Sequence, residues 1–263
     1  MKLGILLAIG LCAVTACDSR ATHVESAGSH RVRVAAAADL QFAMKDLIRE
    51  FEAGRDVKVD ATYGSSGTFY AQLLNRAPFD MFFSADLEYP RQLASRGLTL
   101  DNGEFEYAVG RLVVWTLSSS PLDLSPGGLN ALRSPSVAHV AIANPDHAPY
   151  GRAAVAAMQS AGVYDAVQPK LVFGDNVAQA LQFVQSGAAD TGIVALSLAL
   201  APPVKNRGRY AEVPLETYPR MAQGGTILKW AVDVDAARQL REFVVGAKGR
   251  TILKQYGFFL PGA

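Results

Sequence analysis

The chain of 263 residues alternates between short apolar runs and stretches in which apolar residues recur at helical spacing. The apolar runs predict strands at residues 31–36, 57–63, 79–84, 112–117, 137–143, 170–173, 191–196 and 227–232. The helical spacing predicts helices at residues 40–51, 69–76, 89–96, 152–161, 177–186, 235–248 and 249–256. Alternation of this kind predicts an α/β fold with mostly parallel sheets flanked by helices.

The length of the chain favours two sheets over one. About 230 residues follow the N-terminal region, enough for one large domain or two smaller ones. Ligands of α/β sheets bind beyond the carboxyl ends of the strands, so two sheets could face each other across a cleft. We therefore expect lobe I at residues 31–110 and 228–263 and lobe II at residues 111–227. The crossings would lie near Gly110-Arg111 and Gly224-Gly225 and permit closure around a ligand.

The N-terminus has the pattern of an export signal. Met1-Lys2 precedes an apolar run at residues 3–14, which is too short for an ordinary membrane span and suits a signal peptide. The run ends in Val14-Thr15-Ala16-Cys17, which resembles a bacterial lipobox. We therefore expect residues 1–17 to form a lipoprotein signal region with Cys17 lipidated, and a plain secretory signal cleaved nearby is the alternative.

The residues after this region predict where the protein works. Asp18 resembles the residue that keeps lipoproteins on the inner membrane of Gram-negative bacteria. Residues 18–30 have the composition of a flexible tether. Together these features predict a periplasmic protein that contacts the membrane only through a lipid anchor.

Composition narrows the function classes. The formal charge is +1 and no basic tract is present, which argues against nucleic acid as a partner. The only cysteines, Cys12 and Cys17, lie in the signal region, so the folded part has no thiol chemistry and no disulfide. His139 and His147 have no plausible second metal ligand near them in the sequence. We therefore expect neither a metal centre nor a cofactor.

Small, polar or glycine-rich residues stand at four predicted junctions from strand to helix, at residues 36–39, 64–68, 144–151 and 174–177. A helix start carries unpaired backbone N–H groups and about half a positive charge. Several helix starts that converge can therefore hold an anion without Lys or Arg. The pattern predicts a small oxyanion in a cleft.

These junctions and other segments resemble one known family over nearly the whole mature chain. The matching segments follow family order at residues 35–39, 63–67, 77–86, 144–151, 176–177 and 192–197, with a closing Tyr256-Gly257-Phe258. Together they resemble the periplasmic molybdate-binding component of an ABC importer. The resemblance implies a two-lobed type II periplasmic-binding-protein fold that binds molybdate or tungstate. It also implies delivery of this oxyanion to a membrane permease and its ATPase. We expect the protein to be a monomer and to hold molybdenum only as the oxyanion.

The resemblance also implies which residues contact the oxyanion. The four family contacts fall on Asp39, Ser66, Tyr150 and Val177, with Ser65 and Ala38 as further donors. Ser66 can donate through its hydroxyl and its N–H, although a role as helix N-cap would also explain a serine there. Tyr150 and Val177 would donate backbone N–H, and Val177 can equally be the first core residue of its helix.

Two positions depart from the family pattern. Many members have a tyrosine at the position of Ala195, and the phenol of Tyr150 is a candidate to replace it. Asp39 stands where a neutral Ser or Asn is usual, and a carboxylate at about 4 Å from one negative charge costs about 4 kcal/mol in partly screened protein.

Asp39 has three ways to avoid this penalty. We expect it to turn away and cap the helix by accepting N–H groups of Gln41 or Phe42. It could instead be protonated, or accept a proton that the ligand carries, as monohydrogen phosphate does. The last case would favour another tetrahedral oxyanion, such as phosphate or sulfate, as the ligand.

A serine-dependent hydrolase is the competing class. The turn Gly64-Ser65-Ser66-Gly67 lacks the Gly-x-Ser-x-Gly nucleophile elbow. His147 has no evident role as a base, and we expect it to be a solvated loop residue. Asp80 and Asp86 flank a predicted buried strand and are expected to cap turns or order the region between the lobes. We therefore expect a binding protein and not an enzyme.

Overall fold

The computed structural model describes residues 30–125 and 128–262. The predicted signal region with Cys17, and the predicted tether except His30, lie outside these residues. No helix in the described part is both long enough and apolar enough to cross a bilayer.

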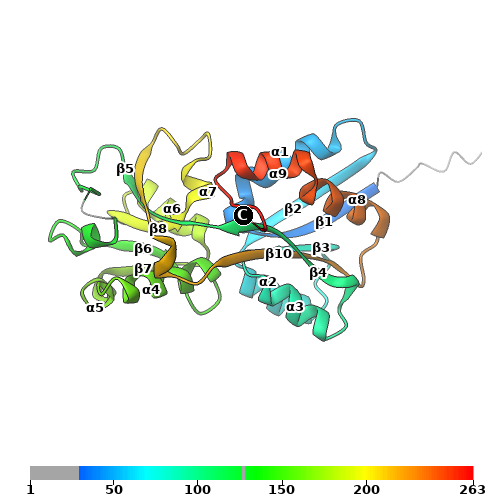
Figure 1. Cartoon of the computed structure of the whole chain (residues 1–263), viewed down its shortest axis with the longest axis horizontal. Helices are drawn as coiled ribbons and strands as arrows, with labels where there is room; N and C mark the ends of the chain where they lie inside the picture. The colour runs from blue at the N-terminus through cyan, green and yellow to red at the C-terminus, as the bar shows by residue number, and fades with distance from the viewer. Residues whose placement is uncertain (1–29, 126–127, 263) are drawn as a thin grey trace, which may run out of the picture.

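The described residues form two five-stranded sheets, each flanked by helices, which lie side by side along the long axis (Figure 1). The strand order of the first sheet is β2-β1-β3-β10-β4. Its strands are β1 (His30–Ala37), β2 (Val57–Gly64), β3 (Met81–Ser84), β4 (Thr99–Gly110) and β10 (Met221–Leu228). Its helices are η1 (Ala38–Leu40), α1 (Gln41–Glu52), α2 (Ser66–Leu74), α3 (Glu88–Ser95), α8 (Val234–Val245) and α9 (Ala247–Gln255). We call this unit the first half.

The second sheet has the strand order β7-β6-β8-β5-β9. Its strands are β5 (Leu112–Leu117), β6 (Val140–Ala143), β7 (Leu171–Gly174), β8 (Thr191–Ala195) and β9 (Gly208–Glu212). Its helices are η2 (Gly128–Arg133), α4 (Pro149–Ser160), α5 (Tyr164–Val167), η3 (Gln168–Lys170), α6 (Val177–Gln185) and α7 (Leu196–Ala199), and η4 (Leu215–Thr217) precedes β10. We call this unit the second half.

Helices cover both faces of each sheet, as the alternating pattern predicts. In the first half α1, α8 and α9 lie on one face and α2 and α3 on the other (Figure 1). In the second half α6 packs on one side of the sheet, and α4 and α5 lie on the opposite side (Figure 1). This arrangement confirms the predicted α/β class with two sheets.

The sheets are mixed rather than mostly parallel. In the first sheet β1 pairs in parallel with β2 and β3, while β10 is antiparallel to β3 and β4. In the second sheet β6 is parallel to β7 and β8, while β5 is antiparallel to β8 and β9. The antiparallel pairs involve β4, β5, β9 and β10, which adjoin the two connections between the halves. At these connections no helix carries the chain back to a parallel neighbour in the same sheet.

Two connections join the halves. Arg111 separates β4 of the first sheet from β5 of the second, close to the expected first crossing. The return runs from the end of β9 to the start of β10 at Met221, whose pairing partner is Gly110. Because all of β10 pairs in the first sheet, the chain returns before Met221 and not near Gly224-Gly225 as the sequence suggested.

Candidate functional site

Four helices begin at the interface between the halves and surround one small cavity. Helices η1 and α2 come from the first half, and α4 and α6 from the second. The space open to the centre of a water-sized sphere is about 10 Å³. The lining residues are Ala37, Ala38, Asp39, Gly64, Ser65, Ser66, Ala85, Ala148, Pro149, Tyr150, Asn176 and Val177. All six sequence-predicted oxyanion donors are in this set, and the described lining contains no Lys, Arg or His.

The second half directs backbone N–H groups to the cavity. Asn176 caps α6, because its side chain accepts from the N–H groups of Ala178 at 3.0 Å and Gln179 at 3.1 Å. Val177 is the first residue of α6, so its N–H has no acceptor within the helix. The side chain of Asn176 does not accept this N–H either. Tyr150 is the second residue of α4, after Pro149, so its N–H also has no acceptor within the helix. Both residues are buried at the cavity wall.

Ser66 presents a hydroxyl and an N–H from the first half. Its Oγ accepts the N–H of Ala85 at 3.0 Å, and this bond leaves the hydroxyl proton free to donate. Ser66 is the first residue of α2, the N-cap is Ser65, and no side chain caps this helix. The alternative interpretation of Ser66 as an N-cap is therefore wrong.

Ser65 connects the two halves. Its Oγ donates to the carbonyl oxygen of His147 at 2.6 Å and lies 3.1 Å from Nδ1 of the same residue. His147 is half-buried against Ser65, so the expectation of a solvated loop residue is wrong. Ser65 lines the cavity, but its hydroxyl proton is already used on a carbonyl, which leaves its N–H as the group available to a ligand.

Asp39 is buried and does not cap a helix. Its Oδ2 accepts from Nε2 of Gln223 at 2.6 Å and from the hydroxyl of Tyr150 at 3.0 Å. No side chain caps η1 or α1, so the expected bonds to Gln41 and Phe42 are absent. Oδ1 is buried with no hydrogen-bond partner among the described residues. Burial raises the pKa of Asp39 to about 6, although hydrogen bonds from Gln223 and Tyr150, and the backbone N–H groups of Asp39 and Leu40, act to lower it.

Tyrosine hydroxyls extend this network. The hydroxyl of Tyr150 donates to Asp39 and accepts from Nε2 of Gln223 at 3.2 Å, and the hydroxyl of Tyr107 donates to Oε1 of Gln223 at 2.9 Å. Burial, and then the negative charge of Asp39, raise the pKa of both tyrosines well above the ordinary value. Ala195 is fully buried at the end of β8. The hydroxyl of Tyr150 is thus hydrogen-bonded to the carboxylate of Asp39 in this structure.

Sequence reasoning missed Gln223 and Tyr107. Gln223 lies in β10 and Tyr107 in β4, both fully buried, and the pairing of these strands brings their side chains together. The only local signal for Gln223 was a polar residue among the mostly apolar and small residues of β10, and the distance of 184 positions from Asp39 to Gln223 hides the contact.

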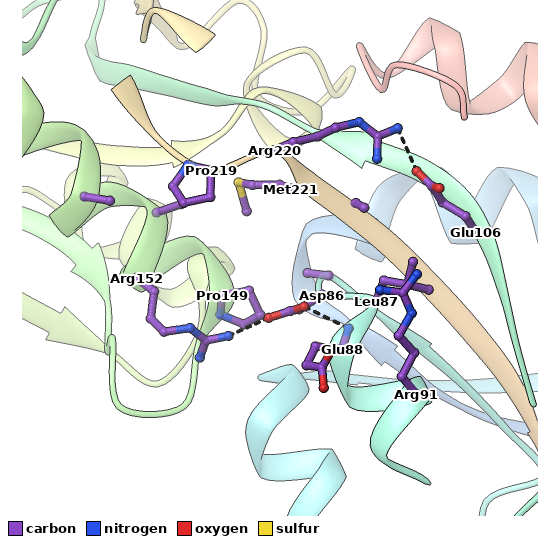
Figure 2. Close-up of a pocket in the computed structure, with 14 residues that line it drawn as sticks. Asp86, Leu87, Glu88, Arg91, Glu106, Pro149, Arg152, Pro219, Arg220 and Met221 are labelled. Carbon is purple, nitrogen blue, oxygen red and sulfur yellow. Dashed lines mark hydrogen bonds and ion pairs between the residues drawn. The ribbon is translucent and has the colours of Figure 1, made fainter. Parts of the chain in front are cut away.

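A wider groove of about 640 Å³ lies beside the cavity and shares Ala85 and Pro149 with it. Figure 2 shows its walls, with α4 on one side and the start of α3 on the other. Arg152 of α4 reaches Oδ2 of Asp86 at 2.7 Å across the groove, and the Arg152 guanidinium lies over the ring of Tyr89, with 5.7 Å to the ring centroid. Asp86 thus links the halves, one of the two roles expected for it.

Asp80 has a different role. It is buried within the first half, where Oδ1 accepts from Nη2 of Arg33 at 3.0 Å and from the N–H of Val232 at 2.9 Å. No group of three or more potential metal-ligating side chains occurs in the described part of the chain. Asp80 and Asp86 therefore act through hydrogen bonds and ion pairs.

Comparison with known proteins agrees with this architecture. A family model described as bacterial extracellular solute-binding protein matches residues 32–259. The molybdate-binding protein ModA of Azotobacter vinelandii is 37% identical over 89% of this chain and 92% of its own length. ModA of Rhodobacter capsulatus is 34% identical over 88% of this chain and 89% of its own length. The solved structure of the Azotobacter vinelandii periplasmic molybdate-binding protein superposes with a TM-score of 0.80 at 32% identity, over 88% of this chain and 99% of that protein. The chain therefore belongs to the ModA family of bacterial extracellular solute-binding proteins.

Proposed function

We propose that this protein captures molybdate or tungstate in the periplasm and delivers it to the permease and ATPase of an ABC importer. The observation that carries the proposal is the convergence of the starts of α2, α4 and α6 on one cavity between the halves. The Ser66 hydroxyl and the N–H groups of Ser66, Tyr150 and Val177 are the proposed donors, with Ser65 and Ala38 as further N–H donors and Asp39 at the same wall.

Neutral donors suit this ligand. Molybdate is a symmetric dianion whose charge spreads over four oxygens, and preorganised dipoles in a dry site can satisfy each oxygen. Cavity size then selects the radius of the oxygen shell. Molybdate and tungstate have nearly the same radius, whereas the smaller sulfate would leave donors unpaired at about 1–3 kcal/mol each.

Closure of two lobes is part of the proposal. Lobe I corresponds to the first half and lobe II to the second, with hinges at Arg111 and in the segment between β9 and β10. Opening at these hinges would separate the donors of η1 and α2 from those of α4 and α6 and expose the site. The contact of Ser65 with His147 and the ion pair of Arg152 with Asp86 would form only on closure.

The cellular setting follows from the sequence. We propose that Cys17 is lipidated and that the predicted tether, shortened to residues 18–29 because His30 belongs to β1, links a monomeric binding protein to the inner membrane. The exposed rims of both lobes would dock the permease. Mass spectrometry of the protein from a Gram-negative host would detect the lipid. A mature form without lipid that starts at another residue would contradict the anchor while leaving ligand capture unaffected.

Calorimetry on the mature domain tests the ligand. Molybdate and tungstate should bind with similar affinity, and sulfate and phosphate should bind at least 100-fold more weakly. A preference for phosphate or sulfate over molybdate would overturn the assignment in favour of another tetrahedral oxyanion.

The short distance between Ser65 and His147 makes a hydrolase the second candidate. Two observations argue against a hydrolase. The Ser65 hydroxyl donates its proton to the carbonyl oxygen of His147. Among the described residues, none forms a hydrogen bond with Nε2 of His147, so nothing there orients the ring as a general base. Tight molybdate binding without turnover of activated esters would exclude this candidate. Ester turnover that disappears in Ser65→Ala would favour it.

A further inference from the structure

Asp39 is the only acidic or basic side chain in the described lining of the cavity. Its Oδ2 is occupied by Gln223 and Tyr150, while Oδ1 is buried and makes no well-formed hydrogen bond among the described residues, although the backbone N–H groups of Asp39 and Leu40 help to stabilise the carboxylate. A buried carboxylate oxygen without a donor is costly, since polar groups in protein interiors are almost always paired. The feature therefore requires an explanation beyond packing.

Among the described residues, the contacts of Asp39 include no cation that would offset its charge. The titratable groups against it are the phenols of Tyr107 from β4 and Tyr150 from α4. The other groups against Asp39 are neutral. They are the amide of Gln223 from β10, the backbone N–H groups of Asp39 and Leu40, and the hydroxyl of Ser197 from α7, which donates to the backbone carbonyl of Asp39 at 2.8 Å. An ionised Asp39 would thus meet an incoming dianion without compensation. At about 4 Å this repulsion is about 4 kcal/mol for each negative charge of the ligand in partly screened protein.

We propose that the oxyanion and one proton bind together, with the proton on Oδ1 of Asp39 donated to an oxygen of the anion. The proton comes from solvent or buffer acid and joins the carboxylate, and no bond within the oxyanion breaks. The carboxyl then becomes one more neutral donor, and Oδ1 gains the partner that it lacks. This inference rests on the proposed function and specifies the protonation state of its site.

The raised pKa of Asp39 determines how molybdate affinity should depend on pH. The pKa of Asp39 is raised to about 6, so below about pH 5 the acid is already neutral and capture takes up no proton. Above pH 6 Asp39 is ionised in the free site, and capture takes up one proton. Affinity should then fall about tenfold for each pH unit above 6, until the pH reaches the still higher pKa of Asp39 in the complex.

Calorimetry of the mature protein with molybdate tests the inference. At pH 7.5, in pairs of buffers with different ionisation enthalpies, the wild type should take up about one proton per anion. Asp39→Asn has nearly the same shape and cannot take up the proton, so its uptake should fall to zero and its affinity should lose the pH dependence. Asp123→Asn is the matched control, because Asp123 is a solvated loop carboxylate bonded only to Ser125 in the described residues. This control should retain the full uptake.

Three outcomes would overturn the inference while the proposed function survives. They are tight molybdate binding by the wild type without proton uptake, unchanged uptake in Asp39→Asn, and wild-type affinity that stays constant between pH 6 and 8. If Asp39→Asn fails to fold, the wild-type uptake and pH series still decide the question. Tight binding of phosphate without uptake would mean that the ligand brings the proton. Absence of molybdate binding at every pH would instead remove the proposed function itself.

Discussion

The backbone N–H of Gly67 donates to the carbonyl oxygen of His147 at 2.9 Å, which joins the start of α2 in the first half to the loop before α4 in the second. A Cβ atom at Gly67 would lie 2.4 Å from that carbonyl oxygen and 2.8 Å from the hydroxyl of Tyr89. The approach of the halves at this point therefore requires a residue without a side chain.

Gly67→Ala should weaken molybdate binding while leaving each half folded. The added methyl group would clash with backbone across the interface and hold the halves apart, at a cost of about 1–3 kcal/mol, or about 5- to 150-fold in affinity. Calorimetry gives the affinity, and circular dichroism checks the fold. Gly187→Ala is the control, because Gly187 has φ +79° and open space around it at the end of α6. It should lower stability without changing affinity, and equal affinities for Gly67→Ala and wild type would contradict this role in closure.

Ser66→Ala should reduce affinity for molybdate by about 10- to 100-fold, since a hydrogen bond to a charged group is worth about 1.5–3 kcal/mol. The substitution removes the hydroxyl at the cavity and the acceptor for Ala85 N–H. Ser186→Ala is a matched control, because that hydroxyl donates to the carbonyl of Phe183 on an exposed part of α6. Titration of both variants under identical conditions measures the effect. A loss of less than threefold in Ser66→Ala would remove Ser66 from the proposed donors.

The strands that form parallel pairs were predictable because they are apolar runs between amphipathic helices. Strand β4 was missed, since residues 99–110 contain Asn102-Gly103 and alternate acidic with apolar residues. This strand depends on long-range pairing, chiefly with β10. Strand β9 is a partly exposed edge strand with little apolar signal. The start of β10 was placed too late in the sequence, because Gly224 and Gly225 resemble a turn. In the structure both glycines lie within the strand and pack closely against Leu87 and Phe105.

The candidate site was predictable as far as local structure defines it. Ser66, Tyr150 and Val177 stand at helix starts, and helix starts have sequence signals. The environment of Asp39 was not predictable, because Gln223 and Tyr150 reach it from a distant strand and from the other half. Local rules favoured a helix cap for an aspartate at this position, and tertiary hydrogen bonds took its place.

Tyr150→Phe should shift the pH dependence of binding without a large loss of affinity at pH 6. The Tyr150 hydroxyl stabilises the ionised carboxylate of Asp39, so its removal raises the pKa of Asp39 above about 6. The decline of affinity should then begin at a correspondingly higher pH. Calorimetry between pH 6 and 8.5 checks this.

Tyr107→Phe is the control for that experiment. Its hydroxyl bonds to Gln223 and to the carbonyl of Ser84, and the structure records no hydrogen bond from it to Asp39. This variant should shift the pH dependence less than Tyr150→Phe. A tenfold or larger loss of affinity at every pH in Tyr150→Phe would instead make the phenol a direct donor to the anion.

Arg33→Ala should destabilise the first half strongly at neutral pH. Arg33 donates from Nε to Oδ2 and from Nη2 to Oδ1 of Asp80, both at 3.0 Å, and the side chain of Asp80 is 1% exposed. Removal of the guanidinium would leave a buried carboxylate without its cation, which costs about 3–5 kcal/mol. Arg31→Ala is the control, because the pair of Arg31 with Asp60 is solvent-exposed and should contribute less than about 1 kcal/mol.

The pH dependence of the unfolding free energy provides a second test of the role of Arg33. Burial acts to raise the pKa of Asp80, but hydrogen bonds from Arg33 and from backbone N–H groups outweigh it and hold the pKa below the ordinary 3.8. A lowered pKa contributes stability above the unfolded-state value, and that stability is lost as the pH falls through the folded-state value. Without Arg33 the folded-state pKa rises, so the free-energy difference between wild type and Arg33→Ala should be largest at pH 7 and shrink towards pH 3. Urea unfolding at both pH values measures it, and a difference independent of pH would show that Arg33 stabilises the protein by packing and not through the charge of Asp80.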